Sequence, residues 1–169
     1  MRLSALGTSV SELLDAFIEE LAKIPDYFMP PNQYVGAGEI PWDGEGLYVY
    51  LGATGVGQPG QPQTQNIPST KAVFTTIGVY VMIIRPASTF GYGSGESPLP
   101  ASDTQLNAEG IQLITDAGAL IKAALAIKKN HQIVSAPQAG FVIGPIVPIG
   151  PLGGLAAMRL YLELSVEQA

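Results

Sequence analysis

The chain has 169 residues, a length that suits one domain with a substantial core. It is 47% hydrophobic but only 13% charged, so it must cover its surface with uncharged residues or bury part of it against partners. The formal net charge of −6 argues against tight nucleic-acid binding, since phosphate contacts need Lys and Arg, although it is compatible with a surface that DNA slides past without sticking. The chain has no cysteine, which excludes disulfides and thiolate chemistry.

Membrane and secretion signals are not found in the sequence. No run of about 18 apolar residues occurs. The N-terminus lacks a basic segment followed by a hydrophobic block. We therefore expect no membrane partner, and a location in the cytoplasm or in an assembly built there.

A first helix is predicted over residues 9–24, where apolar residues recur every three or four positions and acidic residues take the other face. Ser9 and Glu12 fit a capping box at its start. Pro25 predicts a stop after Ile24. The acidic face is either a solvated surface or a contact surface.

The middle of the chain alternates strands with loops. Residues 25–46 are rich in Pro and Gly and predict irregular structure, followed by a short strand over 47–51. The nearly uncharged stretch 52–69 predicts a long loop or an extended arm. Residues 70–85 are dominated by β-branched and aromatic types and predict a long strand with a bend near Gly78.

A second loop, 87–101, precedes a second helix over 104–129. Ser102 and Gln105 fit its N-terminal cap, and two lysines at its end suit the helix dipole. The apolar stripe expected on this helix consists of Leu106, Gly110, Leu113, Ile114, Ala117, Leu120, Ile121, Ala124 and Leu125.

The last two elements are both strands. Residues 132–152 contain four prolines, which cannot donate to a ladder, so an interrupted edge strand is expected. The final stretch alternates with a period of two, which predicts a strand with one buried face. One side carries Met158, Leu160, Leu162, Leu164 and Val166, and the other carries Arg159, Tyr161, Glu163, Ser165 and Glu167.

The order of elements predicts an α+β fold within one domain, residues 1–169. We expect an antiparallel or mixed sheet of about four strands, with both amphipathic helices packed on one face. Long loops are expected at about 52–69 and 87–101.

One glycine motif resembles a nucleotide-binding fingerprint. Residues 55–60 spell G-x-G-x-x-G directly after a strand. Binding of a dinucleotide requires a helix to begin there, so that its amides hold the pyrophosphate. Prolines and glutamines follow instead, which favours a flexible loop.

Other candidate chemistry is sparse. His131 is the sole histidine, so histidine-based metal sites and Ser–His–Asp catalysis lack parts, and its place after a helix end favours a simple electrostatic role. Asp43 and Glu45 flank Gly44 and fit either a turn or a cation site, with turn chemistry favoured. We expect no catalytic residues, no metal and no cofactor.

Aromatic residues are better candidates for contacts. Trp42 is expected to be a core or interface anchor. Tyrosines on the predicted strands fall mostly opposite the aliphatic side chains, where they would form a second packed layer or a subunit contact; they are Tyr48, Tyr50, Tyr80 and Tyr161.

The order of segments resembles that of the tail terminator (tail completion) proteins of long-tailed bacteriophages, and the similarity spans nearly the whole chain. The residues that carry it are Leu13 to Phe17, Val79 to Pro86, the helix from Asn107 to Leu125, and Gly153 to Ala156 leading into Arg159 and Leu160. The stretches 52–69 and 137–151 depart from the compact pattern of this family.

The resemblance implies a structural virion protein without catalytic residues. It implies a ring, usually of six copies, that caps the tail tube and joins it to the connector of the head, with a central channel for DNA. The implied partners are further copies of the chain, the tail tube protein and the head-side connector or stopper protein. Such a ring is assembled in the host cytoplasm and resides in the neck of the virion.

Alternatives remain within and outside this class. A tail tube subunit, or another neck or connector protein, would share related features. A small ligand-binding domain or enzyme would use the glycine-rich loop with Asp43 and Glu45. For a ring subunit, the candidate interface or channel residues are Arg159, Tyr161, Glu163, Glu167, Trp42, Phe90 and Tyr92.

Overall fold

The computed structural model describes residues 4–36, 44–56, 73–87, 102–131, 141–152 and 154–168. It contains two helices and five strands within these ranges. The elements are α1 (Ser4–Ala22), β1 (Gln33–Gly36), β2 (Gly46–Val56), β3 (Val73–Pro86), α2 (Asp103–Asn130), β4 (Phe141–Leu152) and β5 (Leu155–Gln168).

The strands form one mixed sheet in the order β1-β2-β3-β5-β4. β1 runs parallel to β2, and the other neighbours are antiparallel. The predicted α+β class is confirmed, with five strands where about four were expected. The additional strand is β1, which lies within the passage predicted to be irregular.

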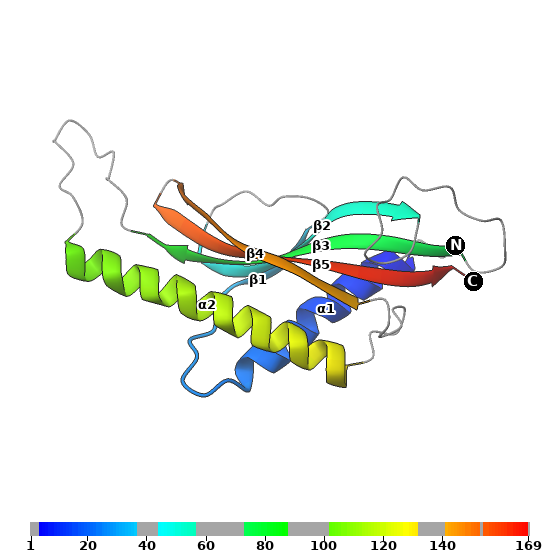
Figure 1. Cartoon of the computed structure of the whole chain (residues 1–169), viewed down its shortest axis with the longest axis horizontal. Coiled ribbons are helices and arrows are strands. Elements are labelled where there is room, and N and C mark those ends of the chain that lie inside the picture. Colours follow the sequence, from blue (N-terminus) through cyan, green and yellow to red (C-terminus); the bar gives the residue numbers. More distant parts are fainter. Residues whose placement is uncertain are drawn as a thin grey trace.

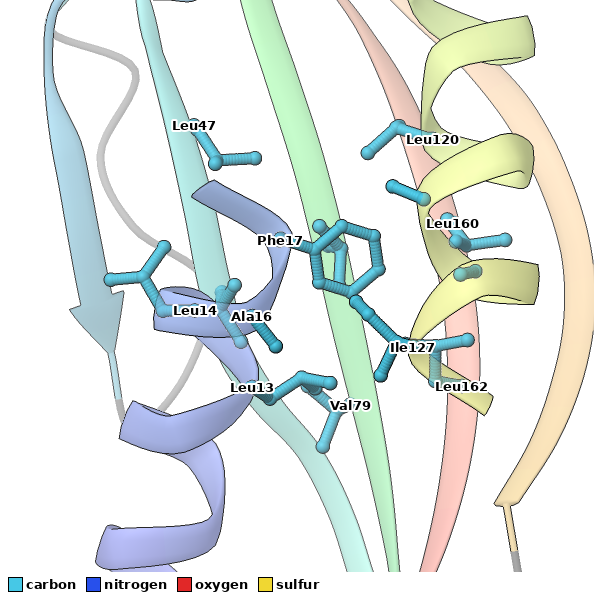
Figure 2. Close-up of a cluster of buried hydrophobic side chains, with 14 of the residues drawn as sticks. Leu13, Leu14, Ala16, Phe17, Leu47, Val79, Leu120, Ile127, Leu160 and Leu162 are labelled. Carbon is cyan, nitrogen blue, oxygen red and sulfur yellow. The ribbon is translucent and has the colours of Figure 1, made fainter. Parts of the chain in front are cut away.

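Both helices cover the same face of the sheet, as predicted, with α2 lying along it and α1 beside it (Figure 1). The main core fills the space between the helices and the sheet. Phe17 of α1 projects toward β3, and Leu120 and Ile127 of α2 approach Leu160 and Leu162 of β5 (Figure 2). All five of these side chains are almost completely inaccessible to solvent.

α1 begins five residues earlier than the sequence predicted. It starts at Ser4, so Ser9 lies inside the helix and is buried, and the predicted capping box at Ser9 and Glu12 is wrong. The helix ends at Ala22, ahead of Pro25, and the next residues close turns instead of continuing it.

β2 is longer than predicted. Residues 52–56, expected to belong to a loop, extend β2 along β3. The pairing shifts between Leu51 and Ala53, opposite Val79 and Gly78. The extra residue lies in β2, whereas β3 pairs with β5 in unbroken register through Gly78, so this irregularity is not the bend of β3 that the sequence predicted.

The ends of α2 agree with the sequence prediction, but the side of the helix that is buried differs from the predicted stripe. Ser102 is the N-cap and accepts a hydrogen bond from the Gln105 amide (3.3 Å). Of the predicted stripe, Leu120 and Ala124 are buried, whereas the large side chains at 106, 114, 121 and 125 are exposed. The residues of α2 that are buried are Asp116, Ala119, Leu120, Ala123, Ala124 and Ile127.

The last two strands follow the sequence closely. β4 is an edge strand whose pairing with β5 is interrupted between Ile143 and Ile146 and again between Ile149 and Leu152, in both cases around a Gly-Pro pair. β5 lies between β3 and β4. Its even-numbered leucines enter the main core, so the predicted alternation is confirmed for the described side chains.

Replacing Phe17 with alanine tests the main core. The Phe17 side chain is fully buried, so Phe17→Ala should lower the free energy of unfolding by about 3–5 kcal/mol, since it removes apolar contacts and leaves a cavity. Urea denaturation followed by circular dichroism measures the change. Leu152→Ala, at a site that is 60% exposed, is the control and should shift stability by no more than about 0.5 kcal/mol. Equal effects of the two variants would contradict this core.

Candidate interaction surfaces

The sheet face opposite the helices carries a layer of tyrosines. Tyr50, Tyr80 and Tyr161 lie directly opposite one another on β2, β3 and β5. The ring centroids are 5.3 Å apart in both neighbouring pairs. Tyr34 of β1 stacks on Tyr48 of β2 with centroids 5.1 Å apart. We call these five tyrosines together with Arg159 the tyrosine face.

Glycines on neighbouring strands allow these rings to lie flat along the sheet. A Cβ atom on Gly78 would lie 2.7 Å from the Tyr161 hydroxyl oxygen, and one on Gly144 would lie 2.7 Å from Tyr161 Cδ1. Tyr80 covers Gly52 in the same way. Aromatic rings that cover strand glycines shield backbone left bare by the missing side chain. Of the five rings, Tyr34 is exposed, Tyr80 and Tyr161 are half-buried, and Tyr48 and Tyr50 are buried.

The charged residues of the tyrosine face are coupled to its rings. The guanidinium carbon of Arg159 lies 4.6 Å from the centroid of Tyr80, a cation–π contact. Tyr161 donates a hydrogen bond from its hydroxyl to Glu163 Oε1 (3.0 Å). Burial is the main cause, and this hydrogen bond the second, that raises the pKa of Tyr161 to about 12. Tyrosine and arginine surfaces of this kind are enriched in protein interfaces.

The structure brings together three of the residues chosen from the sequence. Arg159, Tyr161 and Glu163 lie on the tyrosine face, as the alternation of β5 predicted. Glu167 lies further along β5, opposite Phe74, and its side chain is outside the described part of the chain. The other candidates, Trp42, Phe90 and Tyr92, also lie outside the described residues.

The sequence did not reveal the buried ion pair between Arg85 and Asp116. Arg85 Nε and Nη2 donate to the two carboxylate oxygens of Asp116, at 3.0 and 2.8 Å. Nη1 donates to Glu45 Oε1 (2.8 Å), and Nη2 also donates to the Phe28 carbonyl (2.6 Å). The Tyr27 hydroxyl donates to Asp116 Oδ1 (2.8 Å). The network therefore joins β3, α2, the start of β2 and the segment after α1.

The electrostatics of this network favour the charged pair. Burial opposes the charge of Arg85, but the hydrogen bonds with Asp116 and Glu45 outweigh burial and raise the pKa of the guanidinium. The pKa of the Tyr27 phenol is also raised, mainly by burial and secondly by the charge of Asp116. A signal was present in the sequence, because Asp116 interrupts the apolar pattern of α2, and a buried carboxylate needs a partner.

Glu45 and Gly55, two residues of the ligand-binding alternative, have structural roles. Glu45, expected in a turn or a cation site, pairs with Arg85. Gly55 belongs to β2, where it pairs with Thr76 of β3. Asp43 and residues 57–60 of the glycine motif lie outside the described ranges.

A second polar cluster joins the C-terminal ends of the two helices. His131 Nε2 lies 2.7 Å from Glu20 Oε1. Lys23 Nζ donates to Glu19 and Glu20, at 2.7 Å each, and lowers the pKa of Glu20 together with His131. Glu19, Glu20 and His131 place their ligand atoms within 4.8 Å of one another, a spacing that a metal ion accepts. The Lys23 ammonium already pairs with both carboxylates, and the contact between His131 and Glu20 joins the two helix ends, so the geometry favours a link between helices.

The side of α2 that faces away from the sheet is apolar. Ile111, Ile114, Ile121 and Leu125 are 66, 70, 40 and 57% exposed. An 18-residue window of α2 reaches a mean hydropathy of 1.4, so by length and composition it qualifies as a membrane-crossing helix. One third of this window is buried in the molecule, and core helices of soluble proteins meet the same criterion. The exposed aliphatic side is the second candidate contact surface.

Removing one partner of the buried ion pair should be more harmful than removing both. Asp116→Ala leaves the Arg85 guanidinium buried without its main counter-charge, which should cost about 3–5 kcal/mol of unfolding free energy. The double variant Arg85→Met, Asp116→Leu should lose less than the single variant, since two apolar side chains fill the space without a buried charge. Urea denaturation measures both. A double variant that is as unstable as Asp116→Ala, or less stable, would contradict this assignment.

The Tyr161 hydroxyl is expected to lose its proton only at high pH. The folded-state pKa of Tyr161, about 12, lies above the value of about 10 for a free tyrosine. Its contribution to stability is therefore present below pH 10 and is lost as the pH rises through 12. The phenolate absorbance of the wild-type protein and of Tyr161→Phe is measured as the pH is raised, and the difference between the two curves reports on Tyr161. This difference should appear near pH 12. A difference that appears near pH 10 would contradict the burial of this hydroxyl.

Two comparisons of the sequence with known proteins found no match. No protein-family model matches the chain, and no curated protein sequence matches it. Function is therefore inferred from the surfaces described above and from the order of segments in the sequence.

Proposed function

We propose that the chain is a structural subunit of a protein assembly, and specifically a ring-forming tail terminator that caps a phage tail tube and joins it to the head connector. The observation that carries the proposal is the exposed aliphatic side of α2 on a chain with only 13% charged residues. Large apolar patches mark sites of contact with other proteins or membranes. The resemblance in segment order selects the ring among such assemblies.

Two further features support an assembly subunit. The tyrosine face supplies the exposed or half-buried rings of Tyr34, Tyr80 and Tyr161 on the opposite side of the sheet. Arg159 and Glu163 add polar groups there. The exposed acidic residues of α1, Asp15 and Glu19, contribute to a net charge of −6. An acidic ring would let DNA pass through its channel without sticking.

The proposed ring has six copies, with the tail tube protein and the head-side connector as partners. It is assembled in the host cytoplasm and resides in the virion. A tail tube subunit, or another neck protein, is the second candidate, because it would need the same kinds of contact surface. The proposal involves no catalytic residue, metal or cofactor.

Electron microscopy of the purified protein tests the proposal. Negative-stain images and native mass spectrometry should show discrete rings, and addition of tail tube protein should place a ring at the end of each tube. Long filaments formed by the chain alone would favour a tube subunit instead. Monomers at all concentrations, with tail tube protein present, would contradict an assembly role.

A further inference from the structure

The exposed aliphatic side of α2 has the spacing of a helix-pairing seam. Its residues follow one another at intervals of three, four, three and four positions, and we call them the α2 seam: Ile111, Ile114, Gly118, Ile121 and Leu125. This alternation keeps side chains on one narrow stripe of a helix that packs along another helix. A Cβ atom on Gly118 would meet nothing within 4 Å, so the centre of the seam is open.

We propose that the α2 seam packs against the α2 seam of a second copy of this chain, with the two helices antiparallel around a two-fold axis. In an antiparallel pair, a seam residue that is followed by an interval of three lies opposite one that is followed by an interval of four. Ile111 then lies opposite Ile121 of the second copy, and Ile114 fills the space left above Gly118 of the second copy. The same two contacts occur again on the other side of the axis.

The charges of α2 favour this orientation. Asp103 lies in its first turn, and Lys128 and Lys129 lie in its last turn. In the antiparallel arrangement, Asp103 of each copy lies beside the terminal lysines of the other. The helix dipoles also oppose, which places the positive end of one helix beside the negative end of the other. A parallel arrangement would bring the lysines of the two copies together.

Both edges of the sheet are poorly suited to joining copies. β4 carries Pro145, Pro148 and Pro151, which cannot donate hydrogen bonds to an added strand. β1, at the other edge, has four residues. Short and proline-containing edges are common ways to prevent strand addition. A helix face is therefore a better route to self-association than the edges of the described sheet.

The size of the contact predicts how strong it is. The 28 residues of α2 give a helix about 42 Å long and about 10 Å wide, which presents about 400 Å² on one side. A stable interface buries about 800 Å² on each partner. A single pair of seams therefore associates weakly, whereas several pairs acting together associate tightly.

This contact goes beyond the proposed ring. Ring neighbours contact one another head to tail, whereas a two-fold contact uses the same patch on both copies. In rings that have not yet bound a tube and a connector, the α2 seams would join two rings back to back and double the copy number. Without a ring, they would hold two copies as a dimer.

Cysteine cross-linking tests the arrangement, because the chain has no cysteine of its own. Ile111→Cys and Ile121→Cys are purified separately, mixed in dilute denaturant, refolded and oxidised. Facing Cα atoms of paired helices lie close enough for a disulfide. The mixture should form cross-linked dimers. Neither variant alone should do so, since its two cysteines lie about 15 Å apart along the antiparallel helices.

Two controls make the cross-linking decisive. A mixture of Ile111→Cys with Leu152→Cys, an exposed residue of β4, should give no cross-link. Circular dichroism melts should show that each variant is folded. Cross-linking of Ile111→Cys with itself would overturn the antiparallel arrangement. Equal cross-linking with Leu152→Cys, or none in the seam mixture, would overturn the contact.

A charge placed in the seam gives an independent measurement. Ile114→Glu should weaken self-association by about tenfold or more in analytical ultracentrifugation, because it buries a carboxylate in an apolar contact. The matched variant Leu152→Glu should leave self-association unchanged. Monomeric wild-type protein that floats with phosphatidylcholine vesicles would overturn the proposal in favour of a membrane surface.

These outcomes separate the two proposals. Single rings that are unaffected by Ile114→Glu would overturn the seam contact and leave the ring standing. Dimers that depend on the seam, without rings in any image, would support the seam contact and contradict the tail terminator.

Discussion

The buried ion pair between Arg85 and Asp116 determines how α2 lies on the sheet. Both side chains are almost completely buried, and Asp116 receives both hydrogen bonds from Arg85 only when it faces the end of β3. A buried carboxylate without a partner is costly, so this requirement fixes the rotation of α2 about its axis. The same rotation turns Ile114 and Ile121 away from the sheet. The exposed aliphatic seam is thus a consequence of a buried polar contact.

The sheet separates two layers with different packing. On the helix side, β5 contributes leucines to a core that also contains Phe17 and Ile127. On the other side, the tyrosine rings lie flat over glycines such as Gly78 and Gly144. Period-two alternation produces this separation, because neighbouring residues of a strand point to opposite faces. A one-residue slip of β5 would exchange the two faces, so the register is strongly specified.

The elements that were predicted correctly from the sequence are those in which a single physical cause produces the residue pattern. β5 was predicted because one of its faces is buried, and three candidate residues, Arg159, Tyr161 and Glu163, followed from the same alternation. The rotation of α2 could not be predicted, since apolar residues lie on both sides of this helix and hydropathy does not distinguish them. The ion pair that does distinguish them joins residues 85 and 116, which belong to different elements.

The errors have equally specific causes. β1 has only four residues and lies parallel to β2 at the edge, with Tyr34 and Val35 exposed, so it carries no alternating pattern. Ser9 resembles a cap because it precedes an apolar run, but the helix already begins at Ser4. Trp42, Phe90 and Tyr92 are not among these errors: they lie outside the described residues, so their role at an interface or channel stays a prediction.

The two contact surfaces lie on opposite layers of the molecule, and this separation matters for the proposed assembly. A second copy that docks on the α2 seam approaches from the helix side and does not cover the exposed or half-buried part of the tyrosine face, which consists of Tyr34, Tyr80, Tyr161 and Arg159. That face, with Tyr161 and its neighbours, then remains available for a ring neighbour or for the channel. Because the sheet lies between the two surfaces, each can be changed by substitution without altering the other. A subunit built in this way can make two different contacts independently, one on each side of its sheet.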